Sequence, residues 1–242
     1  MFDVKHSISL LFNANKIYDR QVIEGVGNYL QASKVNWDVY LEEDFTARLN
    51  LIDEWSGDGV IADFDSAEIR EALSNSDKPV IGVGSSYFDE ADYPPVPYVA
   101  TDNYQVVKQA FDHLKGKGLE RFAFYGVPVD ASHLWATERE KIYQYLTRSQ
   151  GYEQFSYQGI TTSPETWQYA INRLADWLHS LPKPIGIIAV TDSRARHILQ
   201  ACELADIAVP DKVAVIGIDD DDIARHLSRV SLSSVTQGAV EM

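Results

Sequence analysis

Polar and aromatic side chains follow most of the short apolar runs in this sequence, where buried strands would end. Asparagine, aspartate, arginine and aromatic residues are common at these positions, while lysine and glycine are scarce. Carboxylate and amide oxygens accept hydrogen bonds from adjacent hydroxyls, arginine donates in a fork, and an aromatic face packs on the C–H face of a ring. A phosphate would instead call for a glycine-rich cradle with lysine. The residue types therefore favour a neutral polyol such as a sugar.

Ten of these residues are the candidates for direct contact with the ligand. They are Asn13, Tyr18, Asp19, Ser85, Asp102, Trp135, Arg139, Thr191, Asp192 and Asp219. Asp19 and Asp192 also stand where helix N-caps are expected, and capping alone would account for both. Within the run 219–222, Asp219 is the ligand candidate because it is next to a predicted strand, and the later aspartates are expected to be solvated.

Several other candidates also have a structural alternative. Trp135 lies in a predicted polar loop, which favours ligand contact over core packing. Arg139 has a neighbouring glutamate on each side, so it could instead form a salt bridge on a helix surface. Tyr18 and Tyr87 would either pack in the wall of a site or touch the ligand. Sequence alone leaves these alternatives open.

Other kinds of chemistry have little support. The Gly-Val-Gly triplets at 25–27 and 82–84 lack the third glycine of a dinucleotide fingerprint, and no GxxxxGK[ST] loop is present. The six histidines are scattered without an HExxH motif, and there is no GxSxG elbow. The single cysteine, Cys202, excludes an internal disulfide. We therefore expect no metal, no cofactor and no enzymatic activity, with a glycosidase that uses two carboxylates as the remaining enzymatic alternative.

The elements that would position these residues alternate between strands and helices. The predicted strands are Ser7–Phe12, Trp37–Leu41, Gly59–Ala62, Pro79–Val83, Tyr98–Thr101, Arg121–Tyr125, Gln154–Tyr157, Ile185–Val190, Val213–Ile218 and Leu232–Val235. The predicted helices are Arg20–Ala32, Ser66–Ser74, Tyr104–Lys117, Thr137–Gln150, Pro164–Ser180 and Ser193–Ala205. Such alternation predicts an α/β fold with open parallel sheets covered by helices on both faces.

The pattern runs twice, which predicts two lobes. We place an N-terminal lobe at 1–103 and a C-terminal lobe at 104–235, with 236–242 beginning a return crossover. The connection has no Gly/Ser-rich tract, so the lobes are expected to pack together and hinge.

Composition narrows the class of protein. The 242 residues include 21 Lys plus Arg and 36 Asp plus Glu, a formal net charge of −15, which argues against direct nucleic-acid binding. Apolar runs such as Ile187–Val190 are too short to span a membrane. A hydrophobic content of 45% can supply a core.

The start of the chain bears on its location in the cell. Because residues 1–6 are not followed by a long apolar region, no signal peptide is recognised and a cytoplasmic location is expected.

Three spaced segments resemble the effector-binding core of LacI/GalR-type regulators, which are related to periplasmic sugar-binding proteins. They read AVTDSRA at 189–195, IAVPDKVAVIGIDD at 207–220 and LSSVTQ at 232–237. Asp206 departs from the glycine that this family usually carries before the I-x-V-P element, a change at a helix end rather than in the pocket.

Further segments resemble a family of bacterial xylose-responsive activators. These segments read FNANKIYDRQVIEGVG at 12–27, DGVIAD at 58–63, ATDN at 100–103 and WATERE at 135–140. The resemblance covers essentially the whole chain and implies a periplasmic-binding-protein-like sensor of type I, normally fused to a C-terminal AraC-type DNA-binding domain.

The resemblance also implies a mechanism and a site. It implies a homodimer that binds D-xylose in the cleft between the lobes and regulates xylose catabolism genes, with DNA contacted only through the C-terminal domain. The family's effector positions fall on Asn13, Asp102, Arg139, Asp192 and Asp219. In the family the chain continues beyond the point that corresponds to residue 242, so we expect a C-terminally truncated form. The alternative function is a transport-type sugar-binding protein without a regulatory role.

Overall fold

The computed structural model describes residues 5–41, 57–128 and 133–242. It divides the chain into two compact units: unit 1 contains Met1–Thr101 and Gly238–Met242, and unit 2 contains Asp102–Gln237. The sequence prediction placed the two divisions after residues 103 and 235. In the structure, Asp102 and Gln237 both belong to unit 2.

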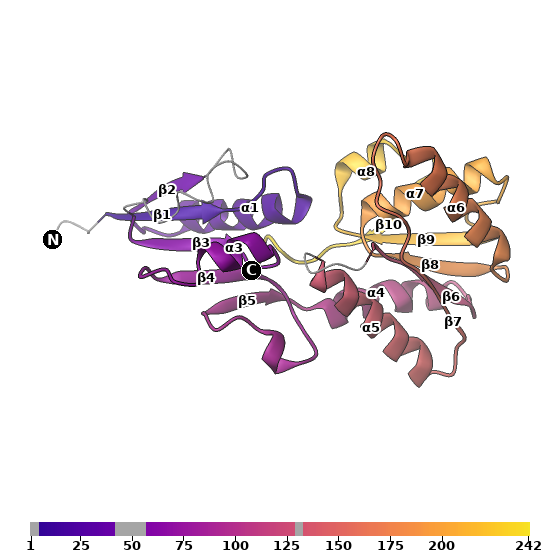
Figure 1. Ribbon diagram of the computed structural model, residues 1–242, viewed down its shortest axis with the longest axis horizontal. Helices are drawn as coiled ribbons and strands as arrows, with labels where there is room; N and C mark the ends of the chain where they lie inside the picture. Colours follow the sequence, from indigo (N-terminus) through magenta and orange to yellow (C-terminus); the bar gives the residue numbers. More distant parts are fainter. Residues whose placement is uncertain (1–4, 42–56, 129–132) are drawn as a thin grey trace. The chain divides into compact units, whose positions relative to one another are not determined.

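Unit 1 is built on a five-stranded sheet of parallel strands in the order β2-β1-β3-β4-β5 (Figure 1). Its strands are β1 His6–Leu11, β2 Trp37–Leu41, β3 Gly59–Asp63, β4 Val80–Ser85 and β5 Tyr98–Thr101. Its helices are α1 Ile17–Ala32, α3 Ala67–Ala72 and the short 3-10 helix η2 Glu90–Asp92.

Each face of this sheet has its own apolar core. Successive strand residues point to opposite faces, so Leu10 packs with Val22 of α1 while Leu11 packs with Ile69 of α3. Residues 238–242 complete the α1 side, where Ala239 is buried among the same side chains as Leu10. Packing in these two cores holds the strands in place, and with them the polar candidate residues at and just after the strand ends of unit 1.

Unit 2 repeats the arrangement with the order β10-β9-β8-β6-β7. Its strands are β6 Phe122–Tyr125, β7 Gln154–Tyr157, β8 Ile185–Ala189, β9 Val213–Ile218 and β10 Ser233–Val235. Its helices are α4 Asn103–Gly116, α5 Leu134–Ser149, α6 Trp167–Ser180, α7 Asp192–Leu204 and α8 Asp222–His226.

Helices cover both faces of the unit 2 sheet. Phe122 and Phe124 of β6 pack with α4 and α5, whereas Ala123 and Tyr125 of the same strand pack with α6 and α7. The predicted fold class, two parallel α/β sheets with helices on both faces, is therefore confirmed. Cys202 on α7 is buried in this core, as a small apolar residue would be.

Several helices begin earlier than predicted. The prediction began α1 at Arg20, but the helix starts at Ile17, so Asp19 lies in its first turn. Likewise α7 starts at Asp192, and its N-cap is Thr191. The N-capping alternative for Asp19 and Asp192 is therefore wrong. The short helix α8 was not predicted, because five residues are too few to show a helical period.

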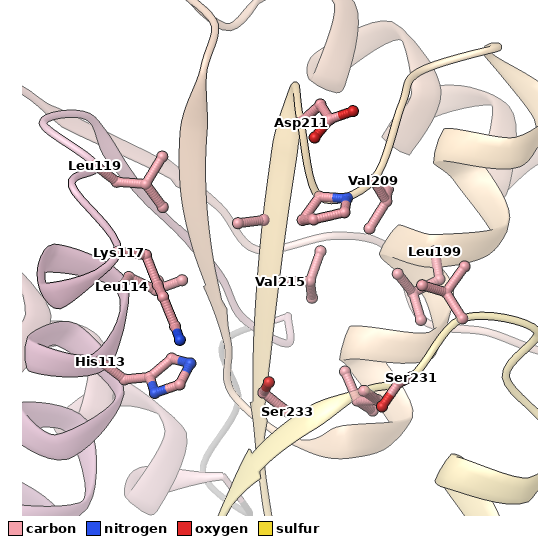
Figure 2. A pocket seen from close by; sticks show the side chains of 14 residues that line it. His113, Leu114, Lys117, Leu119, Leu199, Val209, Asp211, Val215, Ser231 and Ser233 are labelled. Carbon is pink, nitrogen blue, oxygen red and sulfur yellow. The ribbon is translucent and has the colours of Figure 1, made fainter.

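A cavity of about 660 Å³ lies in unit 2 beside β9 (Figure 2). His113 and Lys117 of α4 lie on one side of it and Leu199 of α7 on the other, around Val215 of β9. None of the ten predicted site residues lines it. It lies at the amino-terminal half of β9, away from the carboxyl ends where the polar candidates stand, so it is separate from the candidate site.

No helix in the described part of the chain is long and apolar enough to cross a membrane.

Candidate functional site

In unit 1, buried carboxylates gather where β1 and β3 end. Asp19, in the first turn of α1, is fully buried, and its Oδ2 accepts the Asn13 N–H at 2.6 Å. Asp63 ends β3 and is also buried, with the Lys16 ammonium 2.8 Å from its Oδ2. The carboxyl ends of parallel strands meet at one sheet edge, which explains why the loops after these two strands share a polar site.

A third carboxylate, Asp65, is held by Ser85 at the end of β4 and by Tyr87 just after it. The Ser85 hydroxyl donates to Asp65 Oδ2 at 2.9 Å, and the Ser85 N–H donates to Oδ1 at 3.1 Å. The Tyr87 hydroxyl also donates to Oδ1, at 3.1 Å. We call Lys16, Asp19, Asp63, Asp65 and Ser85 the unit 1 cluster.

The unit 1 cluster binds protons more tightly than ordinary carboxylates do. Burial, with repulsion from Asp63, raises the pKa of Asp19 to about 7, although Lys16 opposes the shift. Burial and the same repulsion raise the pKa of Asp65 to about 6. The Oδ1 of Asp19 is buried without a hydrogen-bond partner in the structure described. This oxygen is a ready acceptor or, when protonated, a donor for a hydroxyl.

Two further candidates of unit 1 already have partners. The Tyr18 hydroxyl donates to the Gly84 carbonyl at 3.0 Å and accepts from the Thr101 hydroxyl at 3.2 Å. The half-buried Asn13 uses its Oδ1 to accept the Asn15 N–H at 3.0 Å. Tyr18 therefore ties the first turn of α1 to the ends of β4 and β5, and Asn13 shapes the loop after β1.

In unit 2, the central residue is Arg139 on α5, which is only 2% exposed. Its Nε donates to Asn103 Oδ1 at 3.0 Å, its Nη1 to the Val190 carbonyl at 2.8 Å, and its Nη2 to Gln237 Oε1. The alternative of a surface salt bridge is wrong, because Arg139 is buried and Glu138 pairs with Lys141 instead. These contacts fix the guanidinium at the carboxyl end of the sheet.

Asp219, directly after β9, faces the same guanidinium. Its carboxylate lies 4.0 Å from Arg139 Nη1, and Gln237 Nε2 donates to its Oδ1 at 2.7 Å. Gln237 thus bridges a buried cation and a buried anion. Burial raises the pKa of Asp219 to about 7, although Arg139 opposes the shift. We call Asn103, Arg139, Asp219 and Gln237 the unit 2 cluster.

Asp192 and Thr191 stand beside this cluster at the start of α7. The Thr191 hydroxyl accepts the Arg194 N–H at 3.2 Å and so caps the helix. Asp192 is fully buried, and its two carboxylate oxygens accept from the Ser234 hydroxyl and the Asp221 N–H. The Asp192 side chain therefore bonds to the loop after β9 and to β10.

Trp135 and Asp102 differ from what their positions in the sequence indicated. Trp135 lies in the first turn of α5, not in a loop, because α5 begins at Leu134 with Trp135 and Ala136 packed against the core. The Arg139 guanidinium carbon lies 4.9 Å from the centre of the Trp135 ring, a cation–π contact. Asp102 is exposed, and its carboxylate caps α4 by accepting the Gln105 N–H at 3.0 Å.

The structure brings some of the ten candidates together and adds others that the prediction omitted. Asp19 and Ser85 join the unit 1 cluster, and Arg139 and Asp219 join the unit 2 cluster. The omitted members are Lys16, Asp63, Asp65, Asn103 and Gln237. The strand-end rule alone could have found most of them, since Asp63 ends β3, Asn103 follows β5 and Gln237 follows β10.

Both clusters have the chemistry of a hydroxyl-binding site. Each combines at least one carboxylate with a cation and with neutral groups that can donate or accept, so it can pair with the O–H groups of a polyol without a net charge on the ligand. No group of three or more His, Cys, Asp or Glu side chains is placed to hold a metal ion within residues 5–41, 57–128 and 133–242.

Two family descriptions match the chain. Residues 7–104 match the XylR N-terminal domain, and residues 111–242 match the periplasmic binding protein-like domain. The chain is 59% identical over its 242 residues to the xylose operon regulatory protein of Escherichia coli K12, and 46% identical to that of Haemophilus influenzae. In both cases the whole chain matches 62% of the relative's length. The resemblance noted from the sequence is thereby confirmed.

Solved structures agree with these matches. The structure of the xylose-binding transcription activator xylR is 57% identical and superposes with a TM-score of 0.91, covering all of this chain and 61% of that one. The trehalose repressor from Escherichia coli, at 12% identity and a TM-score of 0.71, shares the fold alone. Because the second family description covers more than half of its residues, the chain belongs to the periplasmic binding protein-like family.

Proposed function

We propose that this chain is the sugar-sensing part of a transcriptional activator and that its effector is D-xylose. The observation that carries the proposal is the buried Arg139–Gln237–Asp219 arrangement, in which a cation, an amide and a carboxylate meet at the carboxyl ends of the unit 2 strands. The match to relatives named as xylose operon regulatory proteins supports xylose as the sugar.

The unit 2 cluster supplies the specificity of the proposed site. Arg139 and Gln237 donate to hydroxyl oxygens, Asp219 accepts from hydroxyl hydrogens, and the Trp135 ring beside Arg139 offers an apolar face for the C–H groups of the sugar. A sugar that lacked one hydroxyl would leave one of these buried groups unpaired, which costs about 1–3 kcal/mol.

The unit 1 cluster offers a second set of hydroxyl partners. The free Oδ1 of buried Asp19 and the Lys16 ammonium on Asp63 are the groups we assign to this role. That one sugar lies between the two units remains a prediction from the family resemblance, as does the homodimer. The cytoplasmic location remains a prediction from the lack of a recognisable signal peptide. For xylose to act as a switch, it must bind one arrangement of the protein more tightly than another.

Titration calorimetry tests the proposal. We expect heat with D-xylose and weaker or no heat with L-arabinose and D-ribose. Asp219→Ala should weaken xylose binding by about tenfold or more, since it leaves Gln237 Nε2 without its acceptor and Arg139 without its neighbouring negative charge. Asp222→Ala is the matched control, because Asp222 is an exposed aspartate that pairs with Arg225. Absence of heat with all three sugars in a folded sample would refute the pocket assignment.

Two alternative functions are separated by simple measurements. A transport-type binding protein would bind sugar without any effect on transcription, so a reporter gene controlled by the full-length protein distinguishes it from a regulator. A glycosidase would release nitrophenol from nitrophenyl xylosides. The relatives are named as regulators, which supports the proposal that this chain regulates transcription and is not an enzyme.

A further inference from the structure

The loop after β9 has an unusual backbone. Asp219 has φ of 125° and Asp220 has φ of 56°, a region that residues with a side chain rarely adopt. Strained conformations of this kind persist only when the surroundings hold them in place. Since Asp219 belongs to the unit 2 cluster, whatever holds this turn also sets the direction of its carboxylate.

Asp192 contacts this turn at successive residues. Its Oδ2 accepts the Asp221 N–H at 2.7 Å. Its Oδ1 accepts the Ser234 hydroxyl at 2.6 Å, and the same Ser234 oxygen accepts the Asp220 N–H at 3.0 Å. The backbone of Asp192 also forms a hydrogen bond with the carboxylate of Asp219. The Asp192 carboxylate thus holds Asp221 directly and Asp220 through Ser234, while its backbone bonds to Asp219.

Gly217, near the end of β9, allows the Asp192 carboxylate to come this close. A Cβ at Gly217 would lie 2.0 Å from Asp192 Oδ1, so only glycine lets the carboxylate approach the end of β9. Asp192 itself is fully buried. Both of its oxygens already accept hydrogen bonds from the protein, so its carboxylate is satisfied without a sugar.

We propose that Asp192 is a positioning residue, whose carboxylate locks the turn 219–221, with the positive φ angles of Asp219 and Asp220, and so aims Asp219 at the sugar. The proposal rests on the proposed sugar-binding function and deepens it. It differs from the prediction made from the sequence, in which Asp192 binds the sugar directly. In this proposal the loss caused by removing Asp192 passes entirely through Asp219.

A double-mutant cycle separates the two roles. If Asp192 acts only through Asp219, the Asp192→Ala, Asp219→Ala double variant will bind xylose no more weakly than Asp219→Ala alone. If Asp192 contacts the sugar itself, the two losses will multiply. We expect Asp192→Ala alone to weaken binding by about tenfold. Multiplied losses in the calorimeter would overturn the proposal.

The conservative variant adds a readout that a general loss of packing would not give. Asp192→Asn keeps an oxygen that can accept the Asp221 N–H and an amide that can donate to Ser234, so we expect its affinity to stay within about threefold of the wild type. Ser234→Ala removes the link to Asp220 and the partner of Asp192 Oδ1 but keeps the bond from the Asp221 N–H to Asp192 Oδ2, and we expect an intermediate loss. An Asp192→Asn variant as weak as Asp192→Ala would count against the proposed hydrogen bonds.

Hydrogen exchange tests the turn without relying on sugar binding. In the free protein, we expect Asp192→Ala to speed exchange of the Asp220 and Asp221 amides while the amides of β8 stay protected. Asp222→Ala should leave the Asp220 and Asp221 amides unchanged. If the wild type shows no heat with xylose, the proposed function fails, yet this measurement still decides whether Asp192 holds the turn. Unchanged exchange in Asp192→Ala would refute the positioning role.

Discussion

Buried carboxylates are the chemical signature of this protein at the scale of single residues. Asp19 and Asp219 are both shielded from water, and burial raises the pKa of each to about 7. A nearby cation opposes each shift without cancelling it, Lys16 for Asp19 and Arg139 for Asp219. A site of this kind can change between hydrogen-bond donor and acceptor near neutral pH, which suits the mixed donors and acceptors of a sugar.

The first prediction concerns the pH dependence of stability. The pKa of Asp219 rises from 3.8, its ordinary value, to about 7 on folding. Because the pKa of Asp219 is higher in the folded chain, the folded state holds the Asp219 proton more tightly than the unfolded state does. The stability that this carboxyl contributes is therefore complete below pH 3.8 and is lost as the pH rises to about 7. Each such carboxyl contributes up to about 1.4 kcal/mol per pH unit. We expect the free energy of unfolding in urea to fall between about pH 5 and pH 7.

Asp219→Asn provides the control for this effect, because the amide cannot ionise while its oxygen can still accept from Gln237. The variant should show a shallower fall in unfolding free energy over the same pH range. A slope equal to that of the wild type would show that Asp219 does not titrate there.

The second prediction concerns Arg139, whose three nitrogens each have a separate acceptor. Lysine is a point donor and cannot hold Asn103, Val190 and Gln237 at once. Arg139→Lys should therefore destabilise the chain by roughly 2–4 kcal/mol and weaken xylose binding by about tenfold or more. Urea unfolding and calorimetry measure the two effects. The exposed Arg148→Lys change on the same helix should leave both quantities unaltered.

At the scale of elements, the strands were easier to predict than the helix starts. Strands β2, β5, β7 and β9 have the predicted bounds, because each is rich in aromatic or β-branched residues and is bounded by polar or turn residues. The start of α5 was misplaced because Trp135 and Ala136 pack against the core, a tertiary contact that no local signal shows. The same limit applies to the site: the strand-end rule could indicate Gln237, but not that it bridges Arg139 and Asp219.

The third prediction concerns the packing of residues 238–242 on α1. A Cβ at Gly25 would lie 2.4 Å from the Val240 carbonyl oxygen, whereas a Cβ at Gly27 would meet nothing within 4 Å. Gly25→Ala should therefore destabilise the chain by roughly 1–3 kcal/mol through this clash. Gly27→Ala, on the same helix, should stabilise it by up to about 1 kcal/mol, because alanine favours helix. Equal effects of the two changes in urea unfolding would contradict the packing.

At the scale of the whole molecule, the charge balance argues against contact between this chain and DNA. The chain has 21 basic and 36 acidic residues, and many of its cations are already paired. These pairs include Lys16 with Asp63, Lys108 with Asp112, and Arg229 with Glu203. A protein binds DNA by releasing counterions through contacts between Lys or Arg and phosphate. A net charge of −15 instead repels the duplex.

The fourth prediction follows from this balance. These 242 residues alone should show no binding to duplex DNA by fluorescence anisotropy, at low or at physiological salt, and with or without xylose. A full-length relative, such as the xylose operon regulatory protein of Escherichia coli, serves as the positive control because the chain matches only 62% of it. Binding by the chain alone that weakened as salt was added would reveal a basic surface that this sequence does not indicate. Absence of binding, together with heat from xylose, would place sensing in this chain and DNA recognition in the remaining part of the relatives.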